Sequence, residues 1–88
     1  MTHQEALAQV QTIFQEVLKR DNIQLENSYT TNDVDGWNSL SHMIIISHIE
    51  KHFSIKFNFR EVVKFKNVGD LCNAILIKMQ QDYAASFF

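Results

Sequence analysis

The residue best placed to carry chemistry is Ser39, which stands where a polar stretch gives way to an apolar, periodic segment. At the start of a helix, unpaired backbone N–H groups and the helix dipole favour an anion. The free N–H groups and the helix dipole would therefore stabilise the negative charge of a phosphodiester on Ser39. An ordinary capping serine would occupy the same position, because Ser is a preferred N-cap residue. The residue type and place alone leave both interpretations open.

Other nucleophilic or metal-binding arrangements are weaker. The segment Gly36–Leu40 is not a Gly-x-Ser-x-Gly turn, and no evident acid orients His42, three residues after the serine. His48 and His52 are spaced to share one helix face, but no third metal ligand accompanies them. Cys72 falls on an apolar helix face and is expected to be an inert core residue. We therefore expect no catalytic residue, no metal site and no enzymatic activity.

The helix that begins near Ser39 and ends near Phe53 is predicted to be apolar on two faces. At 100° per residue, one side is the core face, with His42 beside it, and collects Ile45, Ile46, Ile49 and Phe53. The opposite side collects Leu40, Met43, Ile44 and Ser47. A small domain cannot bury both faces, so the second is expected to be an exposed patch for a partner or ligand. The alternative is that Leu40 and Met43 pack under the preceding loop.

The remaining pattern predicts the elements that position this helix. A first amphipathic helix is expected from His3 to Arg20, and residues 21–38 form a long polar loop that Ile23, Leu25, Tyr29 and Val34 pin to the core. A short helix around Phe59 to Val63 and a last helix from Asn67, with Asp70 as its capping acid, follow. The sequence thus predicts a single all-α domain over residues 1–88. Its fold is a four-helix bundle with a long loop between helices 1 and 2 and a short third helix.

The segment Asn38-Ser39-Leu40 resembles the Asp-Ser-Leu attachment motif of the acyl carrier protein family, and the similarity covers nearly the whole chain. The preceding Gly36-Trp37 resembles freestanding members of secondary-metabolite and surface-glycan pathways. The resemblance implies that a phosphopantetheinyl transferase, using coenzyme A and magnesium, joins 4′-phosphopantetheine to the Ser39 hydroxyl. It also implies a shuttle that holds acyl groups as thioesters between acyl-loading and acyl-accepting enzymes.

Two departures from the family pattern bear on these partners. Asn38 replaces the usual Asp, which keeps an acceptor oxygen but loses the charge. The predicted second helix is also poor in acids, and Ile44 stands where the family often has one. We therefore expect partners to recognise shape and apolar contact more than charge, through Asn38, Leu40, Met43, Ile44 and Ser47. Trp37 is either a loop-packing residue or a partner anchor, and packing is favoured.

Composition bounds the other function classes. The net charge is −2, and neither half of the chain is basic enough for a nucleic-acid footprint, which argues against a helix-turn-helix DNA binder. The longest strongly apolar run, Met43 to Ile46, is far too short to span a membrane, and no signal peptide is evident. The single cysteine indicates a cytoplasmic protein, expected to be a monomer. The rival interpretation is a helical interaction module without a prosthetic group, in which Ser39 is only a cap.

Overall fold

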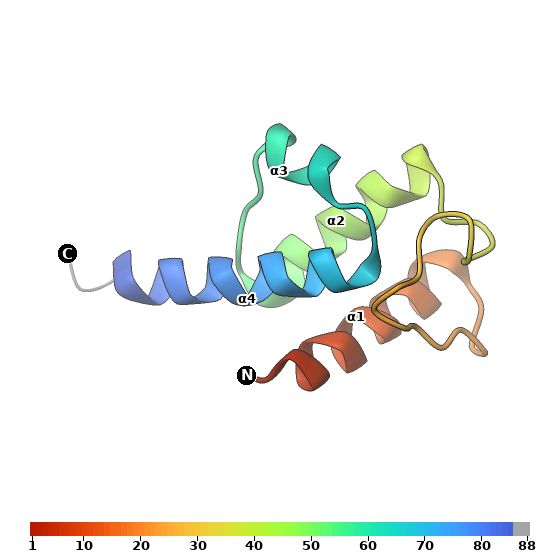
Figure 1. Cartoon of the computed structure of the whole chain (residues 1–88), viewed down its shortest axis with the longest axis horizontal. Coiled ribbons are helices and arrows are strands. Elements are labelled where there is room, and N and C mark those ends of the chain that lie inside the picture. The colour runs from red at the N-terminus through yellow and green to blue at the C-terminus, as the bar shows by residue number, and fades with distance from the viewer. Residues whose placement is uncertain (86–88) are drawn as a thin grey trace.

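The computed structural model describes residues 1–85, with side chains to residue 80; the Phe87-Phe88 tail lies outside this range. Four helices occur in the described range: α1 (His3–Leu18), α2 (Ser39–Phe53), α3 (Phe59–Lys64) and α4 (Val68–Ala85). They form an all-helical bundle with a long loop between α1 and α2 and a short third helix (Figure 1), as the sequence predicts. No helix in residues 1–85 is long and apolar enough to cross a membrane.

Local side-chain chemistry sets the ends of α1. A capping box starts the helix: Thr2 Oγ1 accepts from the Glu5 N–H at 3.1 Å, and Glu5 Oε1 accepts from the Thr2 N–H at 3.0 Å. Lys19 then adopts the left-handed conformation, with φ 56°, and ends the helix after Leu18. The prediction that the helix continues to Arg20 is therefore wrong by two residues, and no basic side chain lies in the last turn.

Each of the later helices begins after an asparagine cap. Asn58 and Glu61 form a capping box at α3, with side-chain bonds of 2.9 Å and 3.0 Å. At α4, Asn67 Oδ1 accepts from the Asp70 N–H at 2.8 Å, but the Asp70 carboxylate accepts from the Lys66 N–H at 3.2 Å rather than from Asn67. The predicted caps are thus present, but Asp70 accepts from the N–H of Lys66, the residue before the Asn67 cap.

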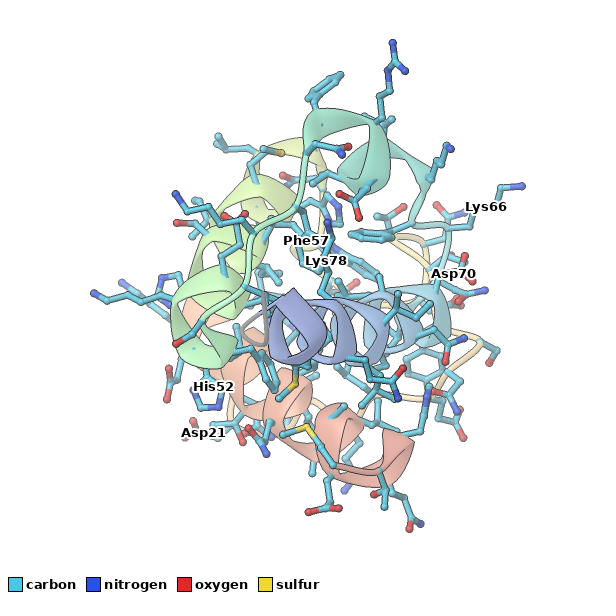
Figure 2. All side chains as sticks on the ribbon, turned by 90° about the vertical axis from the view of Figure 1, so that its left-hand side faces the viewer. Asp21, His52, Phe57, Lys66, Asp70 and Lys78 are labelled. Atoms are coloured by element: carbon cyan, nitrogen blue, oxygen red, sulfur yellow. The ribbon has the colours of Figure 1, made fainter. Side chains whose placement is uncertain are left out.

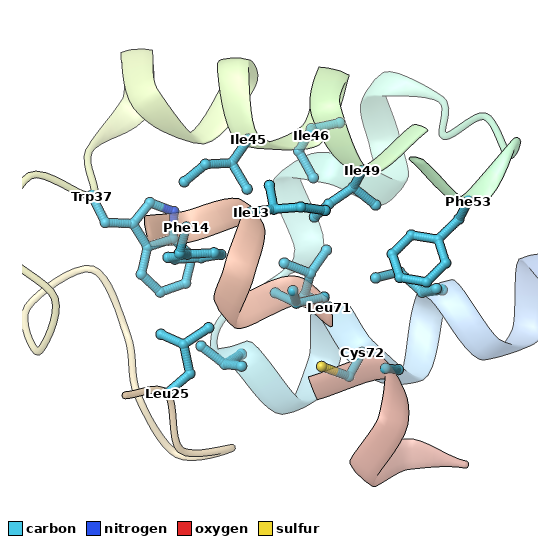
Figure 3. Close-up of a cluster of buried hydrophobic side chains, with 14 of the residues drawn as sticks. Ile13, Phe14, Leu25, Trp37, Ile45, Ile46, Ile49, Phe53, Leu71 and Cys72 are labelled. Carbon is cyan, nitrogen blue, oxygen red and sulfur yellow. The ribbon is translucent and has the colours of Figure 1, made fainter. Parts of the chain in front are cut away.

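The core lies where α2 and α4 meet the inner face of α1, the helix that packs on both (Figure 3). The predicted core face of α2 is buried in full, and it contacts Ile13 and Phe14 of α1 in this cluster. Cys72 of α4 is fully buried, and burial raises the pKa of its thiol to about 11. The expected inert role of Cys72 is consistent with both properties. The buried apolar residues of the helices are Ala6, Val10, Ile13, Phe14, Ile45, Ile46, Ile49, Phe53, Val62, Val68, Leu71, Cys72 and Ile75.

The loop of residues 19–38 is tied to the core and to the start of α4. Leu25 and Val34 are buried and Ile23 and Tyr29 are partly buried, as predicted. The backbone of the loop also caps α4, because the carbonyls of Asn27 and Tyr29 accept the first free N–H groups of that helix at 2.9 Å. These contacts fix the loop, which in turn leads the chain into α2 at a defined point.

Candidate functional site

The start of α2 is capped by Asn38 and not by Ser39. Asn38 Oδ1 accepts from the backbone N–H groups of Leu40 and Ser41, each at 3.0 Å. Asn38 has an extended backbone, and Ser39 is the first helical residue. The interpretation of Ser39 as a capping residue is therefore wrong, because the capping position is already filled. The helix gains nothing from a hydroxyl at residue 39.

Ser41 completes the cap from inside the helix. Its Oγ accepts from the Asn38 N–H at 2.8 Å and donates to the Gly36 carbonyl at 2.6 Å. Gly36 has a φ of 88°, a conformation that side-chain-bearing residues rarely adopt, so the turn depends on glycine. In contrast, Ser39 is exposed, and its hydroxyl makes no hydrogen bond to the described part of the chain. Of the two serines, Ser39 alone offers a free nucleophilic oxygen.

Trp37 anchors the turn before Ser39 in the core. Its side chain is 5% exposed, and its ring packs edge-on against Phe14 with centroids 4.9 Å apart. Its Nε1–H donates to His42 Nδ1 at 3.0 Å, one helical turn into α2. The favoured packing role of Trp37 is thus confirmed. Since Nδ1 accepts, the neutral His42 ring carries its proton on Nε2 and faces the backbone of Val62 in α3.

His42 is held as a neutral ring. Burial lowers its pKa, and the hydrogen bond to the Val62 backbone opposes that effect without reversing it. Protonation would also remove the acceptor that Trp37 Nε1–H uses. His42 is therefore a structural link between the turn, α2 and α3, and it is not poised to activate Ser39.

This arrangement predicts that acid weakens the fold through His42. Because the folded pKa is lowered, the unfolded chain binds the proton first as pH falls through about 6.5. The contribution of neutral His42 to stability is therefore complete above that pH and is lost as pH falls toward the folded pKa. We expect the free energy of unfolding in urea to fall more between pH 7.5 and pH 5.5 for wild type than for His42→Phe. Equal differences in the two proteins would contradict this role.

A groove of about 700 Å³ opens beside Ser39, between the start of α2 and the short helix α3. Asn38 and Ser39 lie at its rim, and Trp37 and His42 line its inner end. Its walls are largely apolar, with Met43 from α2 and the α3 segment opposite. The remaining lining residues are Thr31, Asn32, Phe59, Val62, Val63, Phe65 and Lys66. A flexible chain attached at Ser39 would begin next to an apolar surface.

The outer face of α2 is exposed as the helical wheel predicts. Leu40 is 75% exposed, Met43 48% and Ile44 44%, and Ser47 is also exposed. The alternative that Leu40 and Met43 pack under the loop is therefore wrong. His48 and His52 belong to no group of three metal-ligating side chains in the described residues, and His52 Nε2 instead pairs with Gln9 Oε1 at 2.7 Å.

Comparison with known proteins decides what this arrangement is. Residues 8–75 match the family described as "Phosphopantetheine attachment site". The chain belongs to the acyl carrier protein family. The solution structure of holo acyl carrier protein from Geobacter metallireducens is 39% identical, with a TM-score of 0.83 over 90% of this chain and 91% of that one.

A second solved structure shows the same fold at lower similarity. The crystal structure of acyl carrier protein from Thermotoga maritima is 19% identical, with a TM-score of 0.81 over 90% of this chain and 92% of that one. The comparison with curated protein sequences gives no match. The family assignment confirms the all-α carrier fold and the 4′-phosphopantetheine prosthetic group. Carriers of this family work with a phosphopantetheinyl transferase and biosynthetic enzymes, and they hold acyl groups in transit between them.

The residues around Ser39 fit such a prosthetic group. A phosphodiester needs a free hydroxyl and room around it, and Ser39 is exposed and uncommitted. The capped turn holds the serine in place without using its oxygen. When bound, the arm supplies a terminal thiol, and the protein's own part is to present that arm.

The sequence did not reveal the contribution of α3. Phe59 is 73% exposed and Val63 62% exposed, and both line the groove with Met43. Their spacing of four residues places them on one face of α3. That spacing was the available signal. The packing of α3 across from α2 was needed to join the two faces.

Proposed function

We propose that Ser39 is the attachment point of 4′-phosphopantetheine in this carrier protein. The observation that carries the proposal is the exposed, uncommitted hydroxyl at the first residue of α2, directly after a cap formed by Asn38. Ser41 is engaged in that cap, and Ser28 lies in the loop away from a helix start. The comparison that assigns the family supports an attached arm but does not itself select the serine.

The groove supports a further part of this function. Its opening at Ser39 and its apolar walls suit the first carbons of an acyl chain, which would leave water as they enter. Met43 of α2 and Val63 of α3 are among the residues that line this space. The chain would thus shelter its cargo, while bond making and breaking belong to the partner enzymes.

Partner contact is proposed for the exposed face that begins beside Ser39. Asn38, Leu40, Met43, Ile44 and Ser47 form this face on α2 and its cap. Residues 1–88 would act as one carrier domain, working as a monomer in the cytoplasm, where the lone thiol of Cys72 stays buried and reduced. The rival interaction module without a prosthetic group has lost its main argument, since Ser39 is not the cap.

Intact mass spectrometry tests the proposal. The purified chain is incubated with coenzyme A, magnesium and a phosphopantetheinyl transferase of broad specificity. We expect one added phosphopantetheine, and fragmentation should locate it on Ser39. A protein that keeps its apo mass under conditions that modify a control carrier, or an adduct on another serine, would show that the assignment is wrong.

Asn38→Asp tests whether the transferase needs a charge before the serine. A carboxylate can keep both capping bonds, and a negative charge at a helix start stabilises the fold by about 0.3–1 kcal/mol. If the transferase contact is an exposed ion pair, the gain in modification rate is at most about fivefold. We expect a modest rise in both quantities, measured as urea unfolding and the initial rate of adduct formation. Modification of Asn38→Asp alone would identify the wild-type chain as a carrier that has lost its function.

A further inference from the structure

The segment that runs from the end of α2 through α3 carries an excess of positive charge. The chain has eight Lys and Arg residues, and five of them fall between residues 51 and 66, all exposed. No ion pair involves any of these five in the described part of the chain. They are Lys51 on α2, Lys56 in the following loop, Arg60 and Lys64 on α3, and Lys66 after it.

The two acids of the α2–α3 segment do not balance this charge at the surface. Glu50 Oε2 accepts from the Phe57 N–H at 2.8 Å, and its side chain is partly buried. Glu61 pairs with Lys78 of α4 at 2.9 Å and also closes the α3 cap. Both carboxylates therefore interact with groups of this chain rather than with the cations of residues 51–66. A protein approaching this segment meets the cations first.

These cations lie around the exposed apolar side chains. Lys51 is seven residues after Ile44, two helical turns along the same stripe of α2. Arg60 and Lys64 directly follow the exposed Phe59 and Val63 along α3. Lys66 lines the groove together with Met43 and Ser39, and its side chain extends outward in Figure 2. The face is thus an apolar centre with a basic rim.

Residues 1–38 have the opposite net charge, with six acids against Lys19 and Arg20. Six exposed acids lie on α1, which is on the side of the bundle away from α3 (Figure 1), and in the loop of residues 19–38. They are Glu5, Glu16, Asp21, Glu26, Asp33 and Asp35. The small net charge therefore hides a separation of charge across the molecule. Such a separation orients an approaching partner before contact.

We propose that this carrier docks partner enzymes whose binding surface is an apolar socket rimmed by carboxylates. The proposal rests on the proposed function, because it concerns enzymes that must reach the arm on Ser39. Charge complementarity carries it: a lysine- and arginine-rich partner surface would meet Lys51, Arg60 and Lys64 as like charges. Apolar contact with Leu40 and Phe59 supplies affinity, and the basic rim selects the partner and sets the rate of encounter.

The test uses two phosphopantetheinyl transferases of known structure as probes, one with an acidic carrier-binding surface and one with a basic surface. Rates of adduct formation are measured on the full chain from low to high NaCl. With the acidic transferase, kcat/KM should fall as salt rises, and Arg60→Glu and Lys64→Glu should each lower it by about two- to fivefold at low salt. With the basic transferase, kcat/KM should rise as salt rises, and Arg60→Glu and Lys64→Glu should each increase it at low salt.

Lys19→Glu is the matched control, because it reverses one exposed cation at the end of α1 and leaves the proposed face unchanged. It should change neither rate appreciably, and circular dichroism should show that all three variants fold. Faster modification by the basic transferase, with a rate that falls as salt rises, would overturn the proposal. Cosedimentation with anionic phosphatidylglycerol vesicles that is lost in Arg60→Glu would also overturn it, in favour of a membrane-docking face. Failure of both transferases to modify the chain contradicts the proposed function itself.

Discussion

Replacing Ser39 by Ala is expected to abolish attachment of the phosphopantetheine arm while leaving the fold intact. The Ser39 hydroxyl makes no hydrogen bond in the described structure, and the Asn38 cap does not depend on it. Alanine is also the best helix former, so the first turn of α2 loses nothing. Labelling with fluorescent coenzyme A should fall to background. The free energy of unfolding should stay within about 0.5 kcal/mol of the wild-type value.

Ser41→Ala is the matched control, and its effects should be the reverse. Its hydroxyl bonds the Asn38 N–H and the Gly36 carbonyl, so its loss should destabilise the protein by about 0.5–1.5 kcal/mol. Labelling of this variant should persist. Labelled Ser39→Ala protein, or unlabelled but folded Ser41→Ala protein, would mean that the wrong hydroxyl has been assigned.

Ile49→Ala is expected to cause the largest loss of stability among the changes considered for α2. Ile49 is fully buried in the cluster shared with α1, and truncation leaves a cavity that costs about 2–5 kcal/mol. Urea unfolding of the variant should show this as a lower midpoint. In its folded fraction, the exposed face and Ser39 are unchanged, so the rate of arm attachment below the unfolding transition should stay near that of wild type.

Met43→Asp changes the other face of the same helix and should separate function from stability. Met43 is 48% exposed, so its replacement should cost less than about 1 kcal/mol of folding free energy. A buried charge in the apolar centre of an interface is costly, and transfer to a partner enzyme should slow by roughly tenfold. If Met43→Asp destabilises as much as Ile49→Ala does, the two faces of α2 have been assigned wrongly.

The bounds of α2 could be predicted because two independent signals change at the same place. The Asn-, Asp- and Thr-rich loop ends at Asn38, and apolar periodicity begins at Leu40. The division of α2 into a buried and an exposed face followed from the helical repeat alone. The sequence left the capping role of Ser39 open, because Asn38 and Ser39 are both good N-caps. The Gly36 turn and the Ser41 side chain, which select Asn38, are visible only in three dimensions.

The end of α1 and the groove were beyond sequence reasoning for different physical reasons. Lys19 adopts a left-handed conformation that glycine or asparagine usually signals, so nothing in its type marked the end of the helix. The groove exists because α3 lies across from α2, and a helix of six residues has too little pattern to predict its packing. The sequence shows the five cations of residues 51–66, but their place around the apolar side chains depends on how the loop after α2 positions α3.

The position of Trp37 gives this protein a built-in optical reporter. It is the chain's single tryptophan, and it lies two residues before Ser39 at the inner end of the groove. Intrinsic emission excited at the red edge of protein absorption therefore arises from this one place. Cargo entering the groove, or protonation of His42 against the indole N–H, changes the surroundings of the ring directly. If cargo enters the groove as proposed, loading of the arm should change this emission in the unlabelled protein, and Trp37→Phe is the control that lacks the signal.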